Sequence, residues 1–483
     1  MIDKKYLKQI NNYLWEISPD YKRGMRVPAR IYASRKIFEE MDEGVFEQVT
    51  NVATLPGIQK FAYCMPDGHW GYGFPIGGVA VFDLDTGIIS PGGIGFDINC
   101  GVRLMKTNLD ISEVQPKIKE IIEILFRLVP SGVGSTGIIK LNAAEFKEVM
   151  KKGVKWCVEK NYAKEDDLER IEEYGSMAGA NPEKVSERAL KRGIGQLGTL
   201  GSGNHYLEIQ TVNKIFNPSI AKVFGIEKEG QITIMVHCGS RGFGHQIGTD
   251  YLRLFDRAMP KYGIKVLDRE LACAPFKSPE GQAYFGAMVC AANTAFANRQ
   301  VITHRIREGF TKIFNKKLED LGMDIVYDVA HNIAKLEEHN IDGKVKKVLI
   351  HRKGATRSFG PGQKELPKVY QESGQPVIVG GSMETPSYLL VGTKEAMENT
   401  FGSTCHGSGR TMSRTQARKR VHGRDLQKEM EKKGIIVRTY TYSGLAEEAG
   451  FAYKNISEVV ETVDKAGISR KVCELRPLAN IKG

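Results

Sequence analysis

Five residues that can bind a transition metal follow glycine-rich stretches or the ends of apolar segments. They are Asp97, Cys100, His205, His237 and His331. Together they offer imidazole nitrogen, thiolate sulfur and carboxylate oxygen, a set that favours Mn, Zn, Co or Fe over Ca or Mg. A thiolate can bridge two ions, and two ions can hold a phosphoryl group from both sides during in-line displacement. These residues therefore predict a metal site suited to phosphoryl chemistry.

Spacing alone does not establish that site. No pair of these residues has the separation of a CxxC or HExxH motif. A single histidine at the end of a strand is more often structural, and a single buried cysteine often behaves as a small apolar residue. The histidines at 245, 304, 339, 351 and 422 stand in less suggestive contexts, and we expect them to be structural.

A further candidate for chemistry is His406, which stands between small residues in the stretch 404–410. The glycines that follow it let the backbone approach a phosphate and turn N–H groups toward it. Arg410, Arg414 and Arg418 recur every four residues, so on a helix they share one face. The stretch fits a nucleophilic or ligating imidazole at the mouth of a phosphate-binding loop. Taken alone, it fits a flexible loop before a solvated basic helix equally well.

The elements that would position these residues are a mixture of helices and strands. Helices are expected over residues 117–129, 281–321 and 411–433, and strands over residues 79–82, 231–236, 348–350 and 377–379. Residues 1–60 are expected to form a helical and loop-rich opening segment, residues 63–71 a glycine-rich turn, and residues 456–483 a helix with an extended tail. Because no low-complexity linker or repeat divides the chain, one α+β domain over residues 1–483 is favoured over separate modules.

Composition places the chain among basic globular proteins. It has 483 residues, of which 41% are hydrophobic and 26% charged, and its formal net charge is +12. The positive charge fits a polyanionic partner such as nucleic acid. No long apolar run predicts a membrane span and no N-terminal apolar stretch resembles a signal peptide, so we expect a cytoplasmic protein. The eight cysteines form no CxxC pair, which argues against a disulfide framework or a structural zinc module.

Six segments of the chain occur in the order known from one protein family. They are MPDGH at 65–69, GIGFDINCG at 93–101, GSGNH at 201–205, HCGSRG at 237–242, YDVAHN at 327–332 and CHGSGR at 405–410. These segments resemble the RtcB family, the GTP- and manganese-dependent RNA-splicing ligases, over nearly the whole chain. One departure is Tyr206, where the family often has phenylalanine. The resemblance implies an α+β fold, a single large RtcB-like domain with mixed sheets around a central dinuclear metal site.

The resemblance also implies how the ligands divide between two Mn²⁺ ions. Cys100 would bridge both ions. His205 and His237 would complete the shell of one ion, and Asp97 and His331 that of the other.

His406 would be the catalytic residue, which becomes covalently guanylylated by GTP. The residues that the resemblance places around the guanylate are Asn204, His205, Tyr206, Leu207, Glu208, His331, Asn332, Gly380, Gly381, Ser382, Met383, Ser387, His406, Gly407, Ser408, Gly409, Tyr453 and Lys482. The Glu208 carboxylate could accept the N1 and N2 hydrogens of guanine, which adenine lacks at that edge. Four arginines would contact RNA phosphates, because a guanidinium matches a phosphate bidentately: Arg241, Arg352, Arg410 and Arg414.

The reaction implied by the resemblance joins an RNA 3′-phosphate or 2′,3′-cyclic phosphate to an RNA 5′-hydroxyl, as in tRNA splicing and RNA repair. Water would first open a cyclic end, and the 3′-phosphate would then take GMP from the histidine. Attack by the 5′-hydroxyl on the activated phosphate would release GMP. The expected substrates are tRNA exon halves. The family often works with an archease-type activator protein, and a monomer is the expected state.

Two other functions would use part of the same residues. A dinuclear-metal phosphoesterase acting on RNA ends would need the metal ligands but neither His406 nor GTP. A non-catalytic RNA-binding protein would use metal only to hold its fold. Covalent attachment of GMP to His406 separates the ligase from both alternatives.

Overall fold

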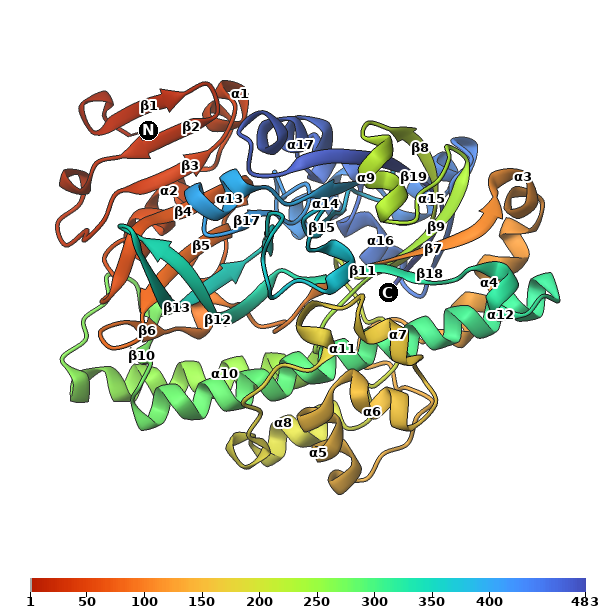
Figure 1. Cartoon of the computed structure of the whole chain (residues 1–483), viewed down its shortest axis with the longest axis horizontal. Coiled ribbons are helices and arrows are strands. Elements are labelled where there is room, and N and C mark those ends of the chain that lie inside the picture. Colours follow the sequence, from red (N-terminus) through yellow and green to blue (C-terminus); the bar gives the residue numbers. More distant parts are fainter. Residues whose placement is uncertain (1) are drawn as a thin grey trace.

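Two large β-sheets form the framework of the computed structural model, which describes residues 2–483 (Figure 1). The first sheet has seven strands in the order β1-β2-β3-β4-β5-β13-β12. Their bounds are β1 Leu7–Asn11, β2 Leu14–Ile17, β3 Ala29–Tyr32, β4 Ile58–His69, β5 Ile76–Asp83, β13 Lys344–Lys353 and β12 Asn332–Ile341. Neighbouring strands pair antiparallel, except that β3 and β4 run parallel.

The second sheet has the order β11-β7-β9-β8-β19-β16-β15, with β18 paired in parallel to β19. The bounds are β11 Ile325–Ala330, β7 Gly101–Asp110, β9 Gln231–Cys238, β8 Tyr206–Ile215, β19 Arg470–Lys482, β16 Ser387–Val391, β15 Pro376–Val379 and β18 Ile436–Thr439. Every residue of β9 is buried, including the polar Gln231, Thr233 and His237, because the strand is covered on both faces.

Two short strand pairs and one connection bring the sheets together. The pairs are β6 (Ile88–Ile89) with β10 (Ala274–Pro275), and β14 (Ala355–Arg357) with β17 (Ser403–Cys405). The chain passes from β11 in one large sheet to β12 in the other through a single residue, His331. This residue therefore marks the place where the two sheets adjoin.

Helices cover the sheets and connect their strands. Their bounds are α1 Arg35–Glu39, α2 Glu43–Val52, α3 Ile111–Val114, α4 Ile118–Leu128, α5 Ala143–Lys152, α6 Val154–Glu159, α7 Glu165–Leu168, α8 Glu187–Gly193, α9 Pro218–Val223, α10 Arg241–Ala258, α11 Pro279–Phe314, α12 Leu318–Leu321, α13 Lys394–Asn399, α14 Arg414–Arg420, α15 Gly423–Lys432, α16 Tyr442–Glu447 and α17 Ile456–Lys465.

The longest helix, α11, runs below both sheets in Figure 1 and packs against α10, α5, α6 and α4. It begins where the Ser278 side chain accepts a hydrogen bond from the Gly281 N–H, with Pro279 in the first turn. Because other helices and strands surround α11, most of its 36 residues are buried, including three consecutive polar residues, 298–300. The helix therefore brings polar side chains into the interior behind the site described below.

The expected strands are present, but the helix expected over residues 281–321 ends at Phe314 and resumes as α12, and the helix expected over residues 411–433 divides into α14 and α15. The tail expected to be extended is strand β19 of the second sheet. Two further corrections lie at the N-terminal end. The opening segment contains α1 and α2, but also the strands β1, β2 and β3, which were not expected. Edge strand β1 is short and largely exposed, so it lacks the alternation of apolar residues that identifies a strand. Residues 63–69 continue strand β4 rather than forming a turn, despite the glycine at 68.

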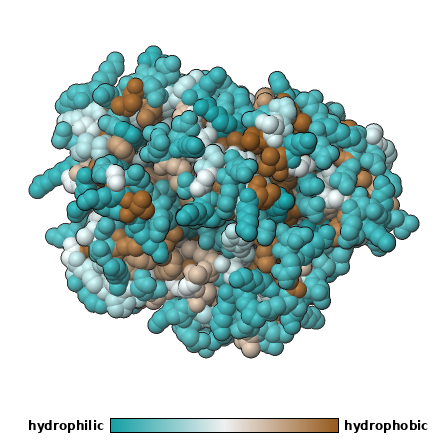
Figure 2. Space-filling view, in the orientation of Figure 1, coloured by the Kyte–Doolittle hydropathy of each residue, from teal (hydrophilic) through white to brown (hydrophobic). Residues whose placement is uncertain are grey.

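The visible face of the molecule is mostly hydrophilic, with separate apolar patches (Figure 2). Among the helices of the described chain, residues 2–483, none has both the length and the apolar composition that a membrane span needs.

Candidate active site

Five neighbouring strands gather the candidate residues at one end of the eight-stranded sheet. Because the neighbours run antiparallel, the ends of β11, β9 and β19 lie beside the starts of β7 and β8. His331 follows β11, Cys100 precedes β7 and His205 precedes β8. His237 is the second-last residue of β9, and Lys482 is the last residue of β19. Residues more than 380 positions apart in the chain therefore meet at one edge, as loops held by rigid strands often do at functional sites.

The first group of possible ligands consists of Asp97, Cys100 and His205. Asp97 Oδ2 lies 2.7 Å from His205 Nε2, and Cys100 Sγ lies 3.4 Å from the same nitrogen. The other ring nitrogen, Nδ1 of His205, is 3.0 Å from the Leu200 carbonyl oxygen. Donation to that carbonyl fixes the ring with Nε2 facing the group, as the hydrogen-bond partners of metal-bound histidines do. Burial lowers the pKa of His205, but the charges of Cys238, Cys100 and Asp97 outweigh it and raise the pKa well above its usual value, so a bound cation would displace the Nε2 proton.

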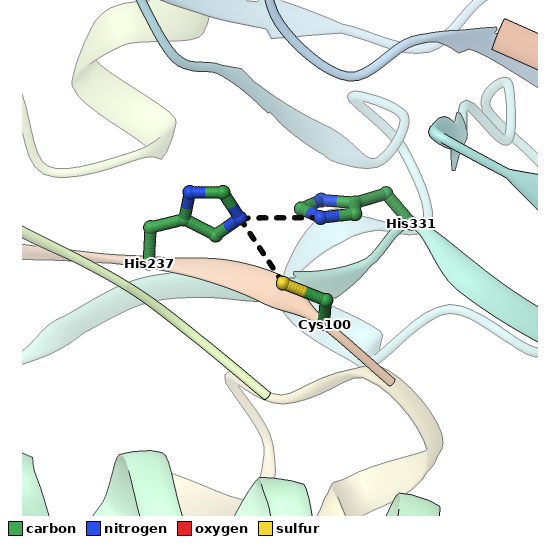
Figure 3. Close-up of side chains that lie close together, drawn as sticks. All are labelled: Cys100, His237 and His331. Atoms are coloured by element: carbon green, nitrogen blue, oxygen red, sulfur yellow. Dashed lines mark hydrogen bonds between the residues drawn. The ribbon is translucent and has the colours of Figure 1, made fainter. Parts of the chain in front are cut away.

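The second group consists of Cys100, His237 and His331, whose side chains converge (Figure 3). His237 Nε2 lies 3.2 Å from Cys100 Sγ and 3.2 Å from His331 Nε2. Burial, and then the charge of neighbouring histidines, hold the pKa of both imidazoles well below the usual value. Both rings are therefore neutral at physiological pH, which is the form that binds metal.

The donor atoms that lie closest together are grouped differently from the expected division of the ligands between two ions, which stays a prediction. Cys100 belongs to both groups, as expected, but His205 is grouped with Asp97, and His237 with His331. The loop that carries Asp97 lies against the start of α10, where the Arg241 N–H donates to Asp97 Oδ1 at 3.1 Å. The spacing of the residues along the chain carries no information about these contacts.

The donor atoms of each group are close enough together to hold a divalent ion. Within each group they lie within 4.8 Å of one another, and atoms that share a metal at roughly 2.0–2.3 Å stand about 3.5 Å apart. Burial, reinforced by Asp97, raises the pKa of the Cys100 thiol to about 12. Burial also raises the pKa of Asp97, but His205 outweighs it and brings the pKa to about 2, so this ligand is charged. A bound cation would displace the thiol proton, as it does at other thiolate sites.

A buried arginine of α11, Arg299, forms hydrogen bonds to the segments that carry the candidate ligands. Its Nη1 donates to the carbonyl oxygens of Asn99 and Cys238, each at 2.8 Å. Its Nε and Nη2 donate to the Asp328 carboxylate at 2.9 and 2.7 Å. Asn99 precedes the ligand Cys100, Cys238 follows a ligand histidine, and Asp328 lies on β11, so one guanidinium fork connects three ligand-bearing segments.

His406 faces the metal ligands from the opposite side of the cavity. It follows β17, and its ring centroid lies 4.8 Å from that of His331. Asp67 Oδ2 accepts a hydrogen bond from His406 Nδ1 at 2.6 Å and another from the His406 N–H at 2.9 Å. Burial raises the pKa of Asp67, but the charge and hydrogen bonds of His406 outweigh it and leave the pKa below its usual value. The charged carboxylate thus holds the proton on Nδ1 and leaves Nε2 free to act as a nucleophile.

A cavity of about 240 Å³ extends from His406 toward the start of β8 and the end of β19. The residues expected around a guanylate that line it are Asn204, Tyr206, Glu208, His331, Asn332, Gly380, Gly381, Ser382, Met383, His406, Gly407, Ser408, Gly409, Tyr453 and Lys482. Gly409 needs to be glycine there, because its φ is +72° and a Cβ would lie 2.1 Å from the Asp67 carbonyl oxygen.

Three residues expected around the guanylate do not line the cavity. Leu207 alternates with Tyr206 and Glu208 along β8, so its side chain points the other way, into the apolar core with Ile209 and Val236. Ser387 lies behind the cavity and accepts a hydrogen bond from the Gly381 N–H at 3.0 Å. His205 faces the first ligand group instead. A side-chain contact between Leu207 and a nucleotide is therefore excluded.

Glu208 is an unusual carboxylate at the inner end of the cavity. It is only 2% exposed, and it accepts hydrogen bonds from the side chains of Gln210 and Asn480. Burial raises its pKa to about 7, although these hydrogen bonds and the charge of Lys482 act in the opposite direction. Lys482 donates from Nζ to the Gly203 carbonyl oxygen at 3.2 Å. Because the Glu208 carboxylate is a buried hydrogen-bond acceptor, the cavity suits a ligand that has N–H donors.

Two residues of the cavity wall were not found from the sequence. Glu448 is buried and lies 3.4 Å from the Arg410 guanidinium and 3.7 Å from Lys482 Nζ. In the sequence it is one of two adjacent glutamates that look like a solvated pair. His69 ends β4 beside Asp67, and although both belong to the MPDGH segment, neither was assigned a role.

The four arginines expected to contact RNA lie in different surroundings. Arg410 and Arg414 line the cavity, and the Arg414 side chain is 53% exposed. Arg241 lies at the first ligand group, with Nε donating to Thr199 Oγ1 at 3.2 Å. These three positions are accessible from, or adjacent to, the cavity.

Arg352 is the exception, and its expected contact with RNA is wrong. It is 1% exposed on β13, where it forms a two-pronged ion pair with Glu337 of β12 at 2.5 and 2.9 Å. It also donates to Ser403 Oγ at 2.8 Å. With its donors used inside the protein, Arg352 holds β13 to β17 and cannot reach a phosphate.

Comparison with known proteins gives one consistent result. A family model described as tRNA-splicing ligase RtcB matches residues 48–483. A tRNA-splicing ligase RtcB from Archaeoglobus fulgidus is 56% identical over 99% of both chains. Those from Thermococcus kodakarensis and Methanococcus maripaludis are each 53% identical over 99% of this chain, and 99% and 100% of their own lengths are covered.

Proposed function

The chain belongs to the RtcB family of tRNA-splicing ligases, and we propose that it joins RNA 2′,3′-cyclic phosphate or 3′-phosphate ends to 5′-hydroxyl ends through a GMP–histidine intermediate. The observation that carries the proposal is the His406–Asp67 pair, because His406 lines the same cavity as His237 and His331 of the second ligand group. A phosphoesterase would need the ligand groups but not a histidine prepared as a nucleophile.

Manganese is the cofactor that we propose, with two ions per chain and Cys100 shared between them. Asp97 and His205 would complete one shell, and His237 and His331 the other. When bound, the ions would neutralise phosphate charge and activate oxygen nucleophiles. The arrangement of Arg299 and of the Leu200 carbonyl keeps these ligands in place.

His406 would attack the α-phosphorus of GTP through Nε2. An N–P bond forms as the bond to the β-phosphate oxygen breaks, and pyrophosphate leaves with its electron pair. Asp67 supports this step because it holds the Nδ1 proton and stabilises the positive charge that grows on the ring. The carboxylate is fully buried, so water does not compete for that hydrogen bond.

The RNA would then react in two steps. An oxygen of its 3′-phosphate attacks the phosphorus of the histidine-bound GMP, and the N–P bond breaks. Next, the 5′-hydroxyl of the other strand attacks the activated 3′-phosphate, loses its proton and expels GMP. A cyclic phosphate end must be opened by water before the first of these steps. The 3′-phosphate needs activation because an unactivated phosphate monoester lacks a good leaving group.

Glu208 would select guanine, since its carboxylate can accept the N1 and N2 hydrogens. Adenine lacks those donors at that edge, so it would leave a buried acceptor unpaired, and such mismatches are strongly rejected. Tyr453 and Lys482 line the same cavity and would complete the nucleotide site.

The wider setting that we propose follows the family. The substrates would be tRNA exon halves, with broken RNAs as further targets, and an archease-type protein would act as activator. The chain would work as a monomer in the cytoplasm. Its net charge of +12 and the exposed arginines of α14 suit a polyanionic substrate.

The test is incubation with GTP labelled at the α-phosphate in the presence of Mn²⁺. We expect an acid-labile GMP adduct on the wild-type protein and ligation of RNA halves that stops when either GTP or Mn²⁺ is omitted. His406→Ala should abolish the adduct, whereas the control His422→Ala, at an exposed histidine, should retain it. Hydrolysis of RNA ends without any adduct would instead identify a phosphoesterase.

A further inference from the structure

One tryptophan stands out from the surface beside the cavity. Trp70 follows β4 directly after His69 and is 59% exposed, whereas Trp15 and Trp156 are 7% and 4% exposed. A large aromatic side chain is seldom left so open, and aromatic groups that stay exposed often mark a binding surface.

The indole is held in place by a glycine at the start of α2. A Cβ at Gly44 would lie 1.7 Å from a carbon of the Trp70 ring, so the ring rests directly on the helix backbone. Any side chain at residue 44 would push the ring away. The ring is therefore both positioned and exposed, which is what a flat stacking partner requires.

Trp70 and the active site are linked by a continuous surface. A second cavity, of about 580 Å³, is lined by Trp70 and also by His69, Arg410 and Arg414. The last three residues line the cavity at His406 as well. The two cavities therefore adjoin at these residues, so a chain that leaves the active site past Arg410 would enter the cavity beside the indole.

The charge along this surface favours a polyanion close to the active site. Arg414 and Arg418 are 53% and 46% exposed on α14, where both also pair with Glu447, and Lys454 lines the cavity while its Nζ donates to the Pro66 carbonyl oxygen at 3.0 Å. At the outer end four acidic residues, Glu40, Asp42, Glu43 and Glu47, and the basic Lys22 line cavities that Trp70 also lines. The Asp42 carboxylate already caps α2 by accepting the Gly44 N–H at 2.8 Å. Cations near the catalytic histidine and an open ring further out match the alternation of phosphate contacts and base stacking seen in single-strand binding.

We propose that Trp70 is a stacking platform for a nucleobase of the RNA strand whose end enters the active site. The site would accept any base, since every base has a flat face that can stack on the indole. The inference rests on the proposed ligase function and adds to it a contact with RNA several nucleotides from the reacting phosphate.

The test is binding of a single-stranded RNA with a 3′-phosphate to the full-length protein at fixed salt. Trp70→Ala should weaken binding by about tenfold, and Trp70→Phe, which keeps a flat ring, should recover most of the affinity. A matched control is Val345→Ala, at another exposed apolar residue, 72% exposed on β13, which should bind as the wild type does. Retention of the fold is checked by circular dichroism.

Abasic substitution locates the stacked base. Replacing one nucleotide at a time by an abasic residue should reveal one or two positions where affinity falls, and that penalty should vanish in Trp70→Ala. RNA should also quench wild-type tryptophan fluorescence, with the quenching reduced in Trp70→Phe. Equal affinities for the wild type and Trp70→Ala would overturn the proposal and would favour a contact of the ring with a protein partner instead. A wild-type protein that forms no GMP adduct would instead refute the proposed function, so the two failures are distinguishable.

Discussion

Asp67 and His406 lie 339 positions apart in the chain, yet the carboxylate accepts from the imidazole Nδ1 at 2.6 Å. The same oxygen also accepts the backbone N–H of His406 at 2.9 Å and that of Gly407 at 3.3 Å. The ring and its backbone are therefore oriented together by one buried carboxylate. This places a nucleophile in a fixed direction before any substrate binds.

Asp67→Asn tests that relationship. The amide keeps the shape of the side chain but removes the charge that stabilises a developing imidazolium and that fixes the tautomer. We expect adduct formation to slow by about 100-fold or more, the range seen when the orienting carboxylate of a histidine is neutralised elsewhere. The measurement is the single-turnover rate of GMP attachment at saturating GTP. Since Asp67 lies behind the histidine, GTP affinity should change little, and an unaltered rate would contradict the assigned role.

Glu208 should make nucleotide binding depend on pH. Its pKa is raised to about 7 by burial, and only the charged form accepts both guanine hydrogens. Affinity should therefore be full above pH 7 and fall as pH drops through that value, by up to about tenfold per unit. Guanosine is the ligand to titrate, because it carries no phosphate that changes charge in this range.

Glu208→Gln is the matched variant for that measurement. It should bind guanosine weakly at every pH, with the pH dependence between 5 and 8 removed. A profile that keeps its shape in the variant would assign the titration to another group.

Cys100 should be required for metal at both positions, because its sulfur belongs to both ligand groups. We expect Cys100→Ala to lose all bound Mn²⁺, and His331→Ala to lose only part of it, since the group with Asp97 and His205 stays complete. Metal content after purification and dialysis measures this directly. Cys473→Ala, at a buried cysteine of β19, is the control and should keep its full content. Equal losses in Cys100→Ala and His331→Ala would argue against two separate positions.

Much of the site is predictable from sequence because its ligands follow apolar strands or glycines. His205, His237 and His331 are recognisable in this way, and each does stand at a strand end. The sequence does not show which strands lie next to each other in the sheet. Which imidazole faces Asp97 depends on the order of strands in the sheet and on the loop before α10, and neither leaves a periodic signal.

The same limit explains the error at Arg352. Its neighbours in sequence include other basic residues, which resemble an RNA-binding group. Its partner Glu337 lies on the adjacent strand, and the pair becomes visible only when β12 and β13 are in register. The role of Glu448 is hidden in the sequence for the converse reason, since its charge is balanced by Arg410 and Lys482, which come from other segments of the chain.

Arg352→Met should therefore affect stability rather than RNA binding. The change leaves Glu337 charged and buried, and breaking one side of such a pair costs about 3–5 kcal/mol. Chemical denaturation should show this loss, and Glu337→Gln in the same chain should recover part of it. RNA affinity, measured well below the unfolding midpoint, should stay within a factor of two or so. A large loss of affinity with unchanged stability would restore the role that burial excludes.

Arg299→Lys tests whether this buried residue of α11 affects the affinity of the site for metal. A lysine offers donors from one point and cannot reproduce the fork that joins Asn99, Cys238 and Asp328. The ligand-bearing segments should loosen, and Mn²⁺ affinity, measured by competition with a chelator, should fall by about 10- to 100-fold, as for other outer-shell partners.

Arg307→Lys is the control on the same helix. Arg307 is also buried and pairs with Asp167 at 2.7 Å, but it donates to no carbonyl beside a metal ligand. Both variants should lower the unfolding temperature, because each weakens a buried ion pair. Only Arg299→Lys should lower metal affinity. If the two lose metal equally, the effect is general destabilisation, and Arg299 has no particular part in holding the ligands.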